Sequence, residues 1–296
     1  MVRWPARDRA GWVQGWALFL PAAVFLGAFT YYPMLSTLYE SLFSTARPRR
    51  PSVFVGLDNY DAMAADPIFW QALWNNLIYA AATIPTAIVL ALAMALWVNG
   101  RLRARALVRM SYFTPTVLPM IAVANIWIFF YAPQIGPVND VMAWLGFGRK
   151  NLLGSPDTAL ACLAVVTAWK EAGFFMIFYL AALQGLPGNL ADAALLEGAS
   201  RWQYLRRVVL PLLMPTTLFI LVNATVNAFR VIDHIIIMTK GGPNNSTMLL
   251  LYYIYLTGFN YWDTSYAAAM TVVLLAILAV AAIGQFLFLD RRTHYT

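Results

Sequence analysis

Six apolar runs, each about as long as a membrane-crossing helix, constrain this chain more than any other feature of its sequence. They cover approximately 16–36, 77–98, 110–131, 159–183, 210–238 and 267–289. Roughly 20 helical residues cross the hydrocarbon core of a bilayer. Of the 296 residues, 61% are hydrophobic and 11% are charged, whereas a soluble domain has about 25% charged residues. The sequence therefore predicts an all-α, polytopic membrane protein with six transmembrane helices.

The arginines and lysines between the runs predict which side of the membrane each connection faces. With the N-terminus inside, the inner segments hold twelve of these residues and the outer segments hold six. Basic residues are enriched in cytoplasmic connections, so we expect both termini to be cytoplasmic. The expected organisation is a cytoplasmic tail over 1–15, one transmembrane domain over 16–290 and a second cytoplasmic tail over 291–296. The same distribution of the net charge of +7 argues against a nucleic-acid partner.

Few side chains suit metal, redox or phosphate chemistry. Cys162 is the single cysteine, and His234 and His294 are the two histidines, so an internal disulfide and a Cys- or His-rich metal site are excluded. The phosphate-binding sequence Gly-x-x-x-x-Gly-Lys-Ser/Thr does not occur. We therefore expect no catalytic residue, no metal and no cofactor bound by this chain.

The inner connection over 184–209 is helical in character, although a plain polar loop is expected there. It reads QGLPGNLADAALLEGASRWQYLRRVV. We expect Asn189, with Asp192 three residues later, to cap a first short helix that Gly198 ends. A second short helix is expected over 200–207, and the two would form a protruding knob. From the residues alone, an interfacial helix pair that merely connects two spans is an equal alternative.

The inner connection also resembles a known transporter signature. The matching residues are Asp192, Ala193, Ala194, Gly198, Val208, Leu210 and Pro211. Their spacing is that of Glu-Ala-Ala, three residues, Gly, nine residues, Ile-x-Leu-Pro, the signature of permease subunits of binding-protein-dependent ATP-driven importers. Asp192 replaces a glutamate, Val208 replaces an isoleucine, and the acidic residue before the glycine is Glu197 rather than an aspartate.

Two outer stretches extend the resemblance along the chain. The stretch over 54–60, and that over 239–243 with the tyrosines that follow it, are similar to the carbohydrate-uptake branch, which includes permeases for disaccharides and for glycerol 3-phosphate. The resemblance implies a type I importer permease fold in a bacterial or archaeal cytoplasmic membrane. It also implies a sugar or polyol-type solute, with glycerol 3-phosphate as an alternative.

The family resemblance implies partners as well. In that family two related permeases pair, and each seats its knob in a cleft of an ATPase subunit. The implied partners are a second homologous permease, two ATPase subunits that carry ATP and magnesium, an extracytoplasmic substrate-binding protein and membrane lipid. The residues implied in coupling to the ATPase are Asp192, Ala193, Ala194, Glu197, Gly198, Arg201, Leu210 and Pro211.

Polar side chains inside the apolar runs are candidates for a solute pathway, because a charge at mid-membrane costs roughly 2.5–3.5 kcal/mol. The candidates are Lys170, Glu171, Asn223, Asn227, Arg230 and Asp233. On one helix, Arg230 and Asp233 would lie one turn apart. The alternative is that Arg230 pairs with Asp233, and Lys170 with Glu171 or a helix-end carbonyl, to hold helices together. A cation in a cavity suits a phosphorylated solute, whereas asparagines and aromatic rings such as Trp169 suit a neutral sugar.

The alternative function is a gradient-driven secondary carrier for a small hydrophilic solute. Such carriers often contain internal repeats, but no repeat relates the first three runs to the last three, and no acidic cluster suits a coupling ion. A channel would need a carbonyl filter sequence, and a membrane enzyme would need a nucleophile–base pair. The sequence therefore favours a non-enzymatic permease subunit.

Overall fold

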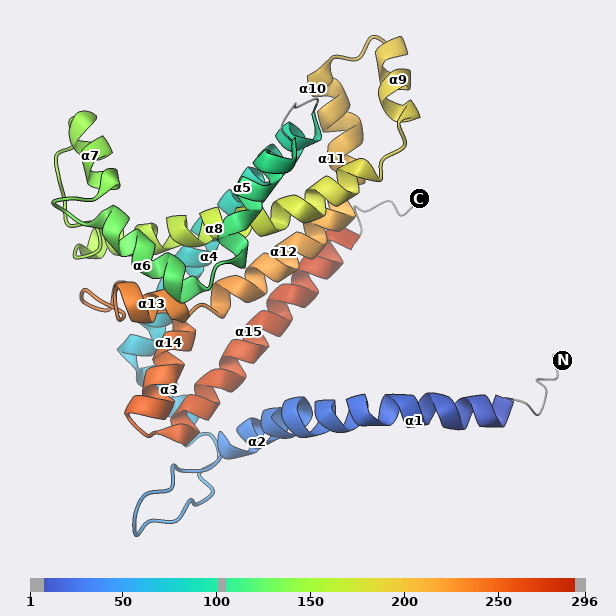
Figure 1. Ribbon diagram of the computed structural model, residues 1–296. Coiled ribbons are helices and arrows are strands. Elements are labelled where there is room, and N and C mark those ends of the chain that lie inside the picture. The colour runs from blue at the N-terminus through green and yellow to red at the C-terminus, as the bar shows by residue number, and fades with distance from the viewer. Residues whose placement is uncertain (1–7, 101–104, 291–296) are drawn as a thin grey trace. The chain divides into compact units, whose positions relative to one another are not determined.

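The computed structural model describes residues 8–100 and 105–290 (Figure 1). Parts of both expected tails, 1–7 and 291–296, lie outside these residues. Six of the inner arginines behind the orientation prediction also lie outside them, namely Arg3, Arg7, Arg101, Arg103, Arg291 and Arg292. The cytoplasmic placement of the tails therefore stays a prediction.

The described residues are predominantly helical, as the sequence predicts. The helices are α1 (Asp8–Leu26), η1 (Gly27–Tyr31), α2 (Tyr32–Glu40), α3 (Asp58–Ala65), α4 (Pro67–Asn99), α5 (Arg105–Val117), α6 (Met120–Tyr131), α7 (Pro137–Trp144), α8 (Pro156–Gln184), α9 (Asn189–Leu196), α10 (Arg201–Tyr204), η2 (Leu205–Val209), α11 (Leu210–Leu212), α12 (Met214–Phe229), α13 (Asp233–Met238), α14 (Leu250–Tyr255), η3 (Leu256–Asn260) and α15 (Thr264–Asp290). Those long and apolar enough to cross a membrane are Gly11–Glu40, Pro67–Asn99, Pro156–Gln184, Met214–Met238 and Thr264–Leu287. A bent pair, Ala106–Val117 and Met120–Tyr131, makes a sixth crossing when it is counted as one span. The prediction of an all-α polytopic membrane protein is confirmed.

The chain forms two compact units. The first comprises Met1–Ala65 with Ile254–Val273, and the second comprises Asp66–Tyr253 with Leu274–Thr296. In the first unit, α1, η1 and α2 run on as one helix that begins at Asp8, inside the segment expected to be a tail. The most apolar part of this helix has no buried residue. Such a surface suits contact with lipid or with another membrane protein.

Asn59 holds the outer stretch that resembles the carbohydrate-uptake branch. Its side-chain amide donates to the carbonyl oxygens of Ser41 and Phe43 at 2.8 and 2.9 Å. Gly56, three residues earlier, has a φ of 62°, a left-handed conformation that glycine adopts without strain. The Gly-Leu-x-Asn spacing thus folds this connection back onto the end of α2.

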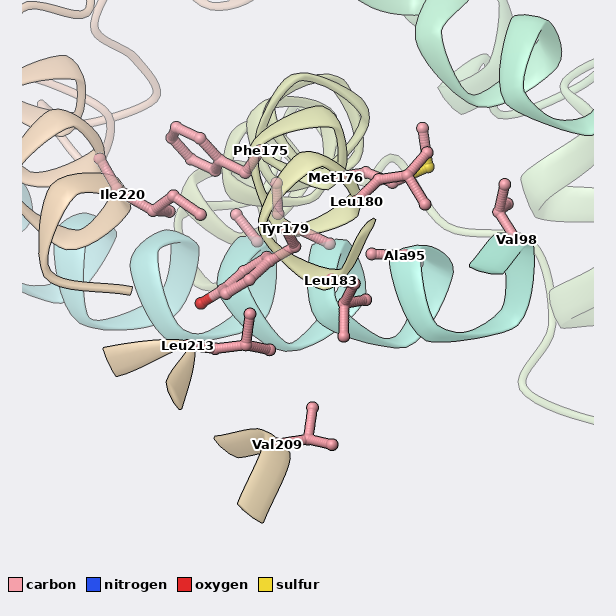
Figure 2. Close-up of a cluster of buried hydrophobic side chains, with 14 residues drawn as sticks. Ala95, Val98, Phe175, Met176, Tyr179, Leu180, Leu183, Val209, Leu213 and Ile220 are labelled. Atoms are coloured by element: carbon pink, nitrogen blue, oxygen red, sulfur yellow. The ribbon is translucent and has the colours of Figure 1, made fainter. Parts of the chain in front are cut away.

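The core of the second unit lies among α4, α8 and α12, which pack against one another (Figure 1). Ala87, Ala91 and Ala95 on α4 are fully buried and share one helix face, because residues four apart align. Phe175 and Tyr179 of α8 are buried in the same cluster (Figure 2). Small residues on one helix let the backbone of the next approach closely, as membrane helices require.

The third span is broken, although the sequence analysis treats 110–131 as continuous. α5 ends at Val117, α6 begins at Met120, and the two helices are bent by 102°. The break lies at Pro119. Proline has no backbone N–H, and in a continuous helix its ring would clash with the carbonyl group of the residue four positions earlier, Pro115. The span predicted over 110–131 is present as this bent pair, and its apolar composition did not indicate the break.

Gly173 allows α8 to cross the end of α5 at close range. A Cβ built at Gly173 would overlap the carbonyl oxygen of Tyr112, and it would lie 3.3 Å from the hydroxyl oxygen of Thr116. The nearest atom belongs to the backbone, which cannot move aside without shifting α5. The absence of a side chain at Gly173 is therefore required by packing.

Gly173→Ala is expected to destabilise the protein by about 1–3 kcal/mol, the usual range for overpacking a core. Gly284→Ala is the matched control, since Gly284 is also helical and has no atom within 4 Å of its added Cβ. The control should be neutral or slightly stabilising, because alanine favours helices. Thermal unfolding in detergent measures both variants. Equal unfolding midpoints would contradict the close crossing.

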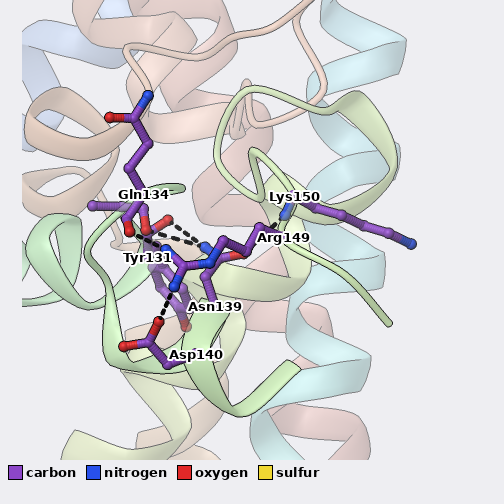
Figure 3. Close-up of polar contacts among 7 residues, drawn as sticks. Tyr131, Gln134, Asn139, Asp140, Arg149 and Lys150 are labelled. Atoms are coloured by element: carbon purple, nitrogen blue, oxygen red, sulfur yellow. Dashed lines mark hydrogen bonds and ion pairs between the residues drawn. The ribbon is translucent and has the colours of Figure 1, made fainter. Parts of the chain in front are cut away.

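The outer connection before α8 is held by Asn139 and Arg149 (Figure 3). The Asn139 amide donates to the carbonyl oxygens of Tyr131 and Ala132 at 3.1 and 3.2 Å. Arg149 forms an ion pair of 2.7 Å with Asp140. The helix α7 lies in this connection and begins with Pro137 at its first position, where proline is favoured.

Candidate transport pocket and coupling loop

A pocket of about 370 Å³ lies within the second unit. Its lining residues are Met120, Thr167, Lys170, Glu171, Asn227, Arg230, Val231, Ile232, Asp233 and His234. Its walls come from α8, the start of α6, the end of α12 and the start of α13. Five of the six side chains that the sequence analysis selects for a solute pathway meet here. The volume falls within the roughly 300–1,000 Å³ of small-molecule sites.

Two broken spans meet at this pocket. One break is that between α5 and α6, and the other is the non-helical segment of residues 230–232 between α12 and α13. Because α12 ends at Phe229, Arg230 and Asp233 do not lie one turn apart on a single helix, and that expectation was wrong. Non-helical backbone at membrane depth is tolerated where it lines a cavity, and both breaks do so.

Lys170 secures the first break. Its ammonium group donates to the carbonyl oxygens of Pro115, Thr116 and Leu118 at 2.8, 3.1 and 2.6 Å. The Pro115 carbonyl would bond the backbone N–H of residue 119 in a continuous helix, and proline at that position has none. Of the alternatives for Lys170, the geometry favours pairing with helix-end carbonyls.

The other charged residues of the pocket are not ion-paired with one another. Among the described residues, the ion pair present is that of Arg149 with Asp140, so the alternative pairing of Arg230 with Asp233 is not formed. Arg230 and Asp233 are exposed, and Glu171 and Asn227 are half-buried. The pocket thus presents both carboxylate and guanidinium groups to a solute.

Two side chains named in the sequence analysis do not line the pocket. Asn223 donates to the carbonyl oxygen of Phe219 on its own helix at 2.8 Å. Trp169 packs edge-on against Trp127, with ring centroids 5.5 Å apart. Asn223 therefore lies apart from the five pathway candidates that the structure brings together.

Two residues that line the pocket, Thr167 and His234, belong to a buried polar cluster that was not predicted from the sequence. The Tyr79 hydroxyl donates to the Thr167 hydroxyl at 2.5 Å, and His234 Nε2 lies 3.2 and 3.3 Å from these two oxygens. All three residues are buried. They join α4, α8 and α13 beneath the pocket. The position of His234 next to Asp233 in an apolar run could have indicated a buried polar contact. In the sequence, His234 was considered only as a metal ligand.

The inner connection forms two short helices, as expected. Figure 1 shows α9 and α10 at the end of the second unit opposite α7 and α13, so connections predicted to be inner and outer lie at opposite ends. Asn189 is the first residue of α9 rather than its cap, Gly188 holds the capping position, and no side chain caps this end. The predicted pairing of Asn189 with Asp192 was therefore wrong.

Gly198 ends α9 in a Schellman motif. Its N–H donates to the Leu195 carbonyl at 3.0 Å, the Ala199 N–H donates to the Ala194 carbonyl at 2.9 Å, and Gly198 has a φ of 71°. This left-handed position is the one that glycine fills at helix ends. The role predicted for Gly198 as the end of the first helix agrees with this geometry.

Ser200 starts the second helix with a capping box. Its hydroxyl accepts from the Gln203 N–H at 3.2 Å, and the Gln203 side chain accepts from the Ser200 N–H at 2.8 Å. The expected helix over 200–207 is α10, which continues without interruption as η2 into α11. The short sequence from Gly198 to Gln203 thus sets the angle between the two helices.

Residues 67–295 match the family described as "Binding-protein-dependent transport system inner membrane component". The chain belongs to this family. It is a multi-pass membrane protein and the permease subunit of an ATP-driven importer, a transport subunit rather than an enzyme. The suggested resemblance is therefore confirmed.

Curated relatives align with almost the whole permease. The sulfoquinovosyl glycerol transport system permease protein of Agrobacterium fabrum is 34% identical and covers 88% of this permease and 85% of its own length. The lactose transport system permease protein of Rhizobium radiobacter is 32% identical and covers 93% of both chains. The sn-glycerol-3-phosphate transport system permease protein of Yersinia pestis is 30% identical and covers 97% and 99%.

Solved structures agree on the fold. A chain of a bacterial ABC transporter that imports the acidic polysaccharide alginate superposes with a TM-score of 0.82 and 25% identity, covering 97% of this permease and 98% of that chain. A chain of a bacterial alginate ABC transporter in complex with an alginate pentasaccharide-bound periplasmic protein gives a TM-score of 0.81 at 25% identity. The predicted importer permease fold is confirmed.

Six of the eight residues that the resemblance implies in coupling are exposed, namely Asp192, Ala193, Glu197, Gly198, Arg201 and Pro211. The other two, Ala194 and Leu210, are half-buried. The side chain of Leu196 is 91% exposed, and the sequence analysis did not select it.

Proposed function

We propose that this permease forms half of the translocation pathway for a sugar or polyol-type solute, with glycerol 3-phosphate as an alternative. The observation that carries the proposal is the pocket, in which Glu171, Asn227, Arg230 and Asp233 converge beside two broken spans. Hydrogen-bonding side chains in a membrane pocket suit a hydroxylated solute. The named substrates of the relatives are of the same chemical class.

In this proposal the inner connection couples the pocket to a separate ATPase. The knob presents an apolar tip at Leu196 between the carboxylates of Asp192 and Glu197, which would meet basic residues of the ATPase. ATP and magnesium belong to that partner. Binding of ATP closes two ATPase subunits, the knobs follow them, and the spans alternate between inward-facing and outward-facing states.

The proposed assembly contains this permease, a second homologous permease, two ATPase subunits and an extracytoplasmic substrate-binding protein. It lies in a bacterial or archaeal cytoplasmic membrane with both termini of this chain cytoplasmic. The unburied helix Gly11–Glu40 supports a second membrane protein or lipid as its contact. The structure of the alginate importer with its periplasmic protein supports a binding protein as a partner.

Purification of the tagged permease from its native membrane in mild detergent tests the assembly. Mass spectrometry should identify a second six-span permease and an ATPase, and the associated binding protein is then screened with sugars, polyols and glycerol phosphates. A chain that purifies alone, or only with itself, would contradict the coupling role of the knob and favour a gradient-driven carrier.

A further inference from the structure

The pocket is lined by equal numbers of acidic and basic side chains, but one of the basic side chains already uses its hydrogen-bond donors within the protein. Two carboxylates, Glu171 and Asp233, and two cations, Lys170 and Arg230, line it. An ammonium group has three N–H donors, and Lys170 directs its donors to the carbonyl oxygens of the α5–α6 break. Lys170 therefore has no donor left for a solute, and Arg230 is the cation that remains available in the described pocket.

A phosphate group would meet poor conditions here. It carries about −1.5 to −2 charge at neutral pH and binds best where several cationic donors converge. In this pocket it would face one guanidinium group and the two carboxylates of Glu171 and Asp233. Repulsion by like charges is strong in a site of low dielectric, so the carboxylates oppose a phosphorylated solute.

A neutral polyol finds complementary groups in the same pocket. Each hydroxyl both donates and accepts a hydrogen bond. The carboxylates of Glu171 and Asp233 accept from hydroxyl groups, and Arg230 and Asn227 donate to hydroxyl or ring oxygens. Met120, Val231 and Ile232 also line the pocket and offer apolar contact to the C–H face of a sugar ring.

We infer that the pocket selects uncharged polyhydroxylated solutes and excludes their phosphorylated counterparts, with Glu171 and Asp233 as the residues that discriminate. This inference rests on the proposed function, and it narrows the solute class from sugars, polyols and glycerol phosphates to neutral sugars and polyols. Selection at the pocket would then operate in addition to selection by the binding protein.

The test compares matched pairs of probes on the whole importer, purified through the tagged permease, with no binding protein added. The pairs are trehalose with trehalose 6-phosphate, and glycerol with sn-glycerol 3-phosphate, each radiolabelled and measured by equilibrium binding. At least one neutral member should bind about tenfold or more tightly than its phosphorylated partner, because the carboxylates of Glu171 and Asp233 repel the phosphate and a tenfold change in affinity corresponds to only about 1.4 kcal/mol. Glu171→Gln and Asp233→Asn should each weaken the binding of that neutral probe. Each should also reduce the ratio between the dissociation constants of the phosphorylated and the neutral member of the pair.

Asp157→Asn is the matched control, because Asp157 is exposed in the first turn of the same helix as Glu171 and does not line the pocket. Asp157→Asn should leave the affinities for the neutral and the phosphorylated probe unchanged. Tighter binding of the phosphorylated member, or binding of neither member in both pairs, would overturn the inference. These outcomes are separate from the proposed function, which stands or falls on co-purification with an ATPase and a second permease.

Discussion

Lys170→Met is expected to lower the stability of the permease by about 3 kcal/mol or more, because a hydrogen bond to a charged group contributes roughly 1.5–3 kcal/mol and the substitution removes three of them. The Lys170 ammonium holds the carbonyl oxygens of Pro115, Thr116 and Leu118 at the α5–α6 break. Thermal unfolding in detergent and the yield of the assembled importer measure the effect.

Lys150→Met is the control for this change of charge and shape. Lys150 lies in the outer connection and is exposed. It donates a hydrogen bond to Asn139 through its backbone N–H, which the substitution leaves in place (Figure 3). A surface substitution of this kind should stay within about 0.5 kcal/mol of the wild type. If Lys170→Met keeps the wild-type unfolding midpoint and alters solute preference instead, Lys170 contacts the solute rather than the break.

Gly198→Asp is expected to reduce ATP-driven uptake at least tenfold while the permease still inserts and folds. No atom lies within 4 Å of a Cβ built at Gly198, so the main structural cost is the left-handed backbone, about 1–2 kcal/mol for a residue other than glycine. Relief of that strain changes the Schellman motif and hence the angle between α9 and α10. With a changed angle between its two helices, the knob would no longer fit the cleft of the ATPase subunit.

Gly188→Asp adds the same charge to the same knob without that strain. Gly188 has a φ of −62° and also has open space around its Cβ. Uptake into cells or proteoliposomes, normalised to the amount of permease in the membrane, compares the two variants. Gly188→Asp should transport at close to the wild-type rate. Wild-type uptake by Gly198→Asp would refute the coupling role of this turn.

Local patterns were sufficient to predict much of the coupling loop. The spacing from Asp192 to Pro211 identified the family, and the turn at Gly198 followed from glycine's access to left-handed conformations. These features depend on residues that are close in the chain. Asn189 shows the limit of such reasoning, because Gly188 and Asn189 are both acceptable capping residues and small energy differences decide between them.

The amino-acid sequence by itself determined the membrane class, the positions of the apolar spans and the family signature, because apolarity and short-range spacing are local properties. Tertiary structure decided the pocket. Lys170 satisfies carbonyls 52 to 55 residues away, and His234 meets Tyr79 across 155 residues. An apolar run does not reveal where its helix breaks or which distant side chain will satisfy the freed backbone groups. Those partners exist only once α4, α5, α8 and α13 have packed together.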